Sequence, residues 1–199
     1  MKSHYQALIK TDVPNFNKGI WKLKAPLKLK VFLWYLRKGV ILTKDNLAKR
    51  NWQGSTTCSF CSENETIRHL FFDCRFARVV WGLIYLTFSI TKPFSVTSMF
   101  GAWLCGFHKR LTNIALLGAA ITVWAIWLHR NDLVFKKKII SSPLQVIYTI
   151  AHWLRTWVVL QKVELQDTVV AASQSLLRVV TDYFTQARGW RSSLRIDCH

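Results

Sequence analysis

Acidic residues are scarce in this chain. Its 199 residues include 10 Asp and Glu against 28 Lys and Arg, which gives a formal net charge of +18. The few acids are scattered, so chemistry that needs several carboxylates converging on metal ions has little to draw on. The basic surplus instead favours polyanionic partners, either nucleic acid or an acidic membrane surface. The alternative interpretation is a solvated basic surface that serves only solubility.

Other common features are also missing. The segment Met1–Gln6 contains no apolar signal-peptide core, so we expect an intracellular location, in the nucleus or cytoplasm, where disulfides are rare. No internal repeat, low-complexity block, glycine-rich phosphate loop, or catalytic arrangement of the Ser/His/Asp or Cys/His type stands out. Hydrophobic residues make up 51% of the chain and aromatics 14%, which is ample material for a core and excludes disorder over most of the length. The length suits one domain or two small ones.

Three of the five cysteines fall in one short segment together with a histidine. Cys58, Cys61, His69 and Cys74 form the pattern C-x2-C-x7-H-x4-C. Zn²⁺ takes four tetrahedral ligands, and a Cys3His set fills all four, which leaves no position for substrate or water. We therefore predict a structural zinc site that catalyses nothing. The alternatives are ordinary buried cysteines beside a surface histidine, or a redox pair at the CxxC.

The segment around these residues predicts short helices separated by a loop. Pro26 suits the first turn of a helix that Gly39 ends. Its predicted apolar face follows the stripe Val31, Trp34, Tyr35 and Lys38 and is widened by Phe32, Leu33 and Leu36. A second short helix is expected from the cap Thr43 to Arg50. On one continuous helix, His69 and Cys74 would lie about 140° apart and could not face one ion. We therefore expect a break near Phe72 and Asp73, with Asp73 as the N-cap of a helix over 74–86.

The rest of the chain predicts a helical region. We expect a polar leader over 1–18, a zinc-binding module over 19–86, a connector over 87–98, a helical region over 99–187 and a basic tail over 188–199. The apolar run 114–128 is shorter than the about 20 residues that span a bilayer, and Arg130, Asp132 and the lysines at 136–138 stop it. A buried helix is favoured over a membrane span. The fold class is mostly α: a small Cys3His zinc-knuckle helical module followed by a helical segment or bundle.

Basic residues concentrate between positions 22 and 50, where Asp45 is the only acid. The candidate nucleic-acid-binding residues are Lys22, Lys24, Lys28, Lys30, Arg37, Lys38, Lys44, Lys49 and Arg50. Trp21, Trp34 and Tyr35 lie among them. Lysine and arginine contacts to phosphates, together with aromatic stacking, suit single-stranded RNA or DNA. We interpret the aromatic residues mainly as core residues. The basic residues either contact phosphates or form the solvent-exposed faces of two helices.

Three stretches resemble a known family. They are residues 21–34 (WKLKAPLKLKVFLW), residues 42–47 (LTKDNL) and residues 65–74 (ETIRHLFFDC), the last followed by Val80 and Trp81. Together they are similar to the zinc-binding domain of plant LINE-type (non-LTR) reverse transcriptases. The later stretch 124–132 (WAIWLHRND) is similar to what often follows this domain.

The resemblance implies a fragment of a retrotransposon protein. In the family this domain usually follows a polymerase domain and often precedes a ribonuclease-H-like domain. The chain has no Asp-Asp pair for a polymerase and only scattered carboxylates for ribonuclease H chemistry, so we expect a stand-alone fragment without either domain. The predicted function is a non-catalytic, zinc-binding, nucleic-acid-binding module with low sequence specificity. The alternative is a helical protein-interaction scaffold with a structural zinc site; membrane attachment is the least favoured.

Overall fold

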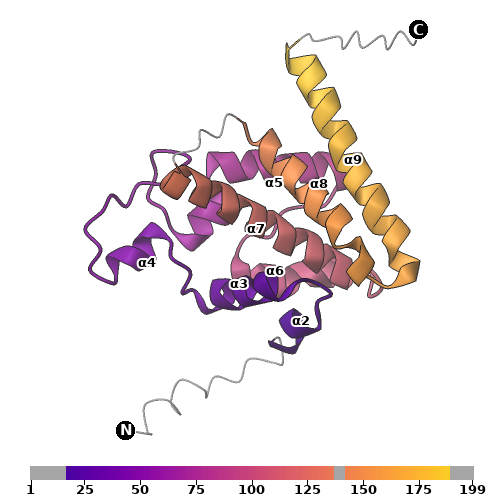
Figure 1. Cartoon of the computed structure of the whole chain (residues 1–199), viewed down its shortest axis with the longest axis horizontal. Helices are drawn as coiled ribbons and strands as arrows, with labels where there is room; N and C mark the ends of the chain where they lie inside the picture. Colours follow the sequence, from indigo (N-terminus) through magenta and orange to yellow (C-terminus); the bar gives the residue numbers. More distant parts are fainter. Residues whose placement is uncertain (1–16, 137–141, 189–199) are drawn as a thin grey trace, which may run out of the picture.

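The protein is described by a computed structural model that covers residues 17–136 and 142–188, which are mainly helical (Figure 1). The α-helices are α2 (Asn17–Lys22), α3 (Leu27–Lys38), α4 (Lys44–Ala48), α5 (Arg75–Phe88), α6 (Val96–Phe100), α7 (Thr112–Lys136), α8 (Leu144–Thr156) and α9 (Val163–Arg188). A π-helical turn, η1 (His69–Asp73), and two 3-10 turns, η2 (Ala102–Gly106) and η3 (Val158–Leu160), complete the set. This confirms the predicted mostly α fold. The expected leader and tail lie almost wholly outside the described residues.

The ends of α3 are where the sequence predicts them, but its buried face is not. Pro26 is the N-cap, and Gly39 ends the helix at φ 71°, a left-handed conformation that glycine adopts without strain. The buried residues are Leu29, Phe32, Leu33 and Leu36. Phe32, Leu33 and Leu36 belong to the predicted face, but its central stripe through Val31, Trp34 and Tyr35 is wrong by about one position. Physically, the observed stripe is uninterrupted by charge, whereas the predicted one runs into Lys38.

Helix α7 lies at the centre of the molecule (Figure 1) and packs against α3, α6, α8 and the turns η1 and η2. It continues well beyond the apolar run 114–128, and its Arg130 side chain is buried. By length and composition alone α7 could cross a membrane, but half of its most apolar window is buried inside the protein. Burial on several sides is what a central core helix requires.

The core runs through both halves of the chain without interruption. Helix α9 packs on α8 and on α5, and α8 packs on α7. One cluster of buried side chains joins Ile20 and Leu70 of the first half to Ile126 and Leu176 of the second. The division into a zinc module and a helical region at 87–98 stays a prediction, yet the two parts share this core.

Candidate metal centre and basic surface

A short loop positions the first two candidate ligands. An isolated bridge pairs Thr57 with Asn64, and the Cys58 N–H donates to the carbonyl of Glu63 at 2.7 Å. These bonds close residues 57–64 into a tight loop that holds Cys58 and Cys61 on its inner side. The sequence pattern CxxC predicts such a knuckle, and the loop has this form.

The other two candidate ligands are brought together by a π-helical turn. His69–Asp73 forms this turn, and the Cys74 N–H donates to the His69 carbonyl at 2.7 Å, five residues back. Cys74 itself is extended, with ψ 139°, and is the N-cap of α5. The predicted break is therefore present at Cys74, but Asp73 as N-cap is wrong. Its carboxylate instead pairs with Arg68 at 2.9 Å and Lys92 at 3.8 Å. π-turns are rare and occur frequently at functional sites.

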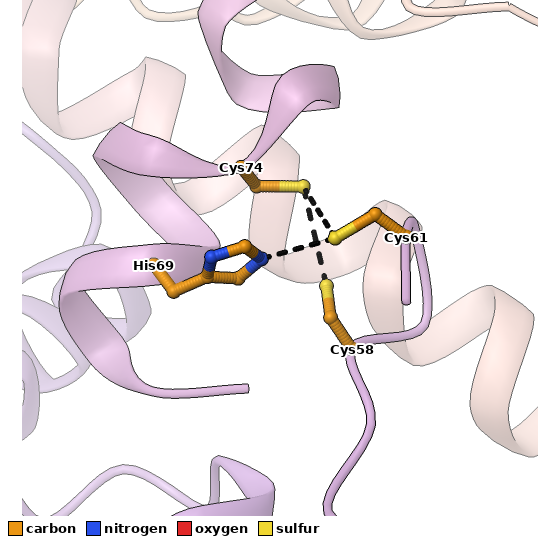
Figure 2. Close-up of side chains that lie close together, drawn as sticks. All are labelled: Cys58, Cys61, His69 and Cys74. Carbon is orange, nitrogen blue, oxygen red and sulfur yellow. Dashed lines mark hydrogen bonds between the residues drawn. The ribbon is translucent and has the colours of Figure 1, made fainter. Parts of the chain in front are cut away.

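The four side chains converge on one point (Figure 2). Their ligand atoms all lie within 4.8 Å of one another. Cys61 Sγ is 3.1 Å from His69 Nε2 and 3.7 Å from Cys74 Sγ, and Cys58 Sγ is 4.0 Å from Cys74 Sγ. Tetrahedral Zn²⁺ with metal–sulfur bonds of about 2.3 Å requires sulfurs about 3.8 Å apart. The two sulfur–sulfur distances fit this spacing, so the donor set and its geometry suit zinc.

The sulfurs also receive backbone hydrogen bonds, which favour thiolates. The Phe60 N–H donates to Cys58 Sγ at 3.4 Å, and the Phe76 N–H bonds to Cys74. The hydrogen bond between the two cysteines, together with burial, raises the pKa of the Cys58 thiol, whereas the same hydrogen bond lowers the pKa of Cys74. Zinc binds cysteine as the thiolate, so a metal ion at this site would displace the thiol protons.

Two stacked aromatic rings follow the first and last candidate ligands in the chain. Phe60 and Phe76 stack with their centroids 4.1 Å apart and an interplanar angle of 2°. Each follows a cysteine by two residues, and each donates its N–H to that cysteine. The sequence analysis missed this pair, although the matching offset from Cys58 and Cys74 was a visible signal. The stacked pair thereby ties the loop that carries Cys58 to the start of α5.

A buried ion pair joins the knuckle loop (residues 57–64), through the adjacent Glu65, to the central helix α7. Arg130 Nη2 of α7 donates to Glu65 Oε1 at 2.7 Å, and its Nε lies 3.2 Å from the same oxygen. The side chains are 2% and 0% exposed. Glu65 also accepts the Lys44 N–H at the start of α4 at 3.0 Å, while its backbone N–H donates to Thr56. Glu65 therefore links the knuckle loop, α4 and α7.

The basic candidates differ in their surroundings. Lys22, Lys24, Lys28, Lys38, Lys49 and Arg50 are exposed, whereas Lys30, Arg37 and Lys44 are half-buried. Lys30 donates to the Trp21 carbonyl at 3.1 Å, and Lys44 donates to the Thr57 carbonyl. Lys49 pairs with Asp45 at 3.6 Å. The exposed members are thus more available to an anionic ligand than the half-buried ones.

The aromatic residues of this segment are more exposed than the sequence predicts. Trp21 and Tyr35 are each 45% exposed, Trp52 is 42% exposed, and Trp34 is half-buried. The interpretation of Trp21 and Tyr35 as core residues is therefore wrong. The reason for Tyr35 is the rotated face of α3, which turns this residue to solvent.

Comparison with known proteins agrees with the metal centre. Residues 1–81 match a family model described as zinc-binding in reverse transcriptase. The first 81 residues, less than half of the chain, are thus similar to this family. The match confirms the resemblance and includes all four residues of the Cys3His cluster. In this family the zinc-binding region is not the catalytic part of the reverse transcriptase.

One relative extends the comparison. A protein of Arabidopsis thaliana, named as a candidate ribonuclease H protein, is 26% identical over 87 residues, which are 41% of this chain. The chain covers 14% of that relative's length. No solved structure matches the chain significantly. The part of the chain after residue 81, which includes α7, α8 and α9, lies outside the family match.

Proposed function

We propose that the protein binds single-stranded or structured RNA or DNA with low sequence specificity, inside the cell, and that one structural Zn²⁺ on Cys58, Cys61, His69 and Cys74 holds the binding surface in shape. The zinc ion would fix the knuckle loop relative to α4 and α5. The surface itself is the basic segment 22–50. Its relatives among reverse transcriptases and ribonuclease H proteins support a nucleic acid as the ligand.

The observation that carries the proposal is the exposure of aromatic rings among lysines. Trp21 lies beside exposed Lys22, and Tyr35 lies on α3 near exposed Lys38. Exposed rings next to cations match the way proteins bind single strands, with bases stacked on aromatic side chains and phosphates on lysine and arginine. A surface kept basic only for solubility has no use for exposed tryptophan.

We further propose that the chain alone catalyses no reaction. A closed Cys3His set leaves no coordination position for water or substrate. Glu65, the one buried acid in the described part of the chain, is paired with Arg130. These features favour a structural role for the zinc ion.

The experiment compares two variants that leave the net charge unchanged. Trp21→Ala/Tyr35→Ala removes the exposed rings of the basic segment, and Tyr85→Ala/Tyr148→Ala removes two rings of 51% exposure on α5 and α8. Stacking is worth roughly 1–3 kcal/mol per base, so we expect the first variant to lose at least about tenfold in affinity for a fluorescent 20-nucleotide oligomer. The second should bind like wild type. Equal losses in both variants, or a wild type that does not bind, would refute the proposal.

A second candidate function is a protein-interaction scaffold. It is favoured by exposed apolar side chains where α8 leads into α9: Val159 is 73% exposed and Val163 is 78% exposed. Val159→Ser/Val163→Ser leaves nucleic-acid binding unchanged if the proposal above is correct. Retention of a protein partner that this variant abolishes, together with no oligonucleotide binding by wild type, would favour the scaffold.

A further inference from the structure

Three segments that are far apart in sequence line one basic cleft. Its cavity of about 420 Å³ is bordered by Lys22 at the end of α2 and Lys24 after it, by Lys109 and Arg110 before α7, and by Lys162 just before α9. The volume is in the range of ligand-binding pockets. Glu164 is the single acid among the lining residues. The last three cations lie beyond the part of the chain that matches the family.

The positive charges of this cleft are not compensated by the protein. Within the described ranges 17–136 and 142–188, none of the five cations forms an ion pair. Like charges that border one cavity repel each other, so an anion that enters the cleft is stabilised by all of them. The first turn of α9 contributes in the same direction, since the N-terminus of a helix has a partial positive charge.

The cleft is fixed by buried and hydrogen-bonded neighbours. Gln161 Nε2 donates to the Lys24 carbonyl at 2.7 Å and thereby joins the start of α9 to the segment after α2. Ile20 and Leu23, on either side of Trp21 and Lys22, are buried in the core. The cations therefore project from an ordered frame, so little conformational entropy is lost when a ligand binds.

We propose that this cleft holds the phosphate backbone of a bound nucleic acid. The inference rests on the proposed function and extends its surface from residues 22–50 to α7 and α9. A nucleic acid suits the cleft better than an anionic membrane, because interfacial membrane binding uses a broad apolar face beside the cations. Here the lining contributes only Ile114 and Leu165 as large apolar residues.

The test uses two variants that each remove two positive charges. Arg110→Gln/Lys162→Gln changes the cleft outside the family match, and Arg78→Gln/Arg178→Gln changes exposed arginines on α5 and α9 that do not line it. All four side chains are exposed, so we expect equal urea midpoints for the two variants and wild type. Binding of a fluorescent single-stranded 20-nucleotide oligomer is titrated by anisotropy at 50 and 200 mM salt, and sedimentation with phosphatidylserine vesicles is measured in parallel.

Each phosphate contact contributes about 0.7 to the slope of log K against log salt for single strands. We expect the cleft variant to lose about 0.7–1.4 from this slope and the control variant to lose clearly less. If wild type binds and the two variants behave alike, the cleft inference is wrong while the proposed function stands. If wild type binds no oligomer, the proposed function fails as well. Vesicle binding that depends on the cleft, without oligomer binding, would identify a membrane ligand instead.

Discussion

Replacement of Arg130 by methionine is the sharpest test of whether the buried ion pair holds the knuckle loop against α7. The change keeps most of the side-chain length but removes the guanidinium, which donates Nη2 and Nε to the carboxylate of Glu65. The fully buried Glu65 carboxylate then loses its ion-pair partner and keeps the hydrogen bond from the Lys44 N–H at 3.0 Å. Removal of one partner of a buried ion pair costs about 3–5 kcal/mol. A whole domain has about 5–15 kcal/mol of stability, so the loss is a large share.

The assay is urea unfolding followed by tryptophan fluorescence in zinc-containing buffer. Arg78→Met, at an exposed site on α5, is the matched control, and we expect it to change the unfolding free energy by at most about 0.5 kcal/mol. Glu65→Gln/Arg130→Met should be less destabilised than the sum of the two single changes, because no unpaired charge stays buried. If Arg130→Met costs less than about 1 kcal/mol, the ion pair does not fasten the loop to α7 and the reasoning is refuted.

Three further outcomes are expected. The Cys61→Ser variant should lose zinc, and its hydrogen exchange should rise most over residues 50–86, because structural zinc contributes on the order of 10 kcal/mol to such a module. A uniform loss of protection across the chain would instead show that the shared core makes the whole chain one cooperative unit. Lys22→Gln/Lys24→Gln/Lys28→Gln/Lys30→Gln should weaken binding to all oligomer sequences alike and lower the salt slope, and a loss confined to one sequence would contradict backbone contacts. Zinc affinity in a chelator competition should fall from pH 8 to pH 6, because protons compete for the thiolates and the pKa of Cys58 is raised; an affinity independent of pH would argue against thiolate ligands.

The metal centre was largely predictable from the sequence because its signal is local. Four ligand residues within 17 positions are visible without a structure. Helix geometry also showed that His69 and Cys74 cannot share a continuous α-helix, which required a break. The kind of break could not be predicted, since a π-turn depends on how Phe71 and Phe72 pack in the core, where both are fully buried.

Contacts between residues that are far apart in the chain could not be predicted from the sequence. The ion pair of Arg130 could not be predicted, because its partner Glu65 lies 65 residues earlier in the chain. The face of α3 was predicted one position away because both stripes contain apolar residues, and only packing on α7 decides between them. The basic cleft depends on the fold alone, since Lys24, Arg110 and Lys162 have no shared sequence pattern.

X-ray absorption at the zinc edge tests the central claim most directly. The sample is the full chain purified from zinc-supplemented medium, with the metal content measured on the same material. We expect one zinc per chain, with three sulfur ligands at about 2.3 Å and one nitrogen at about 2.0–2.1 Å. A chain without zinc, or a shell with fewer than three sulfurs, would contradict a site built from Cys58, Cys61, His69 and Cys74.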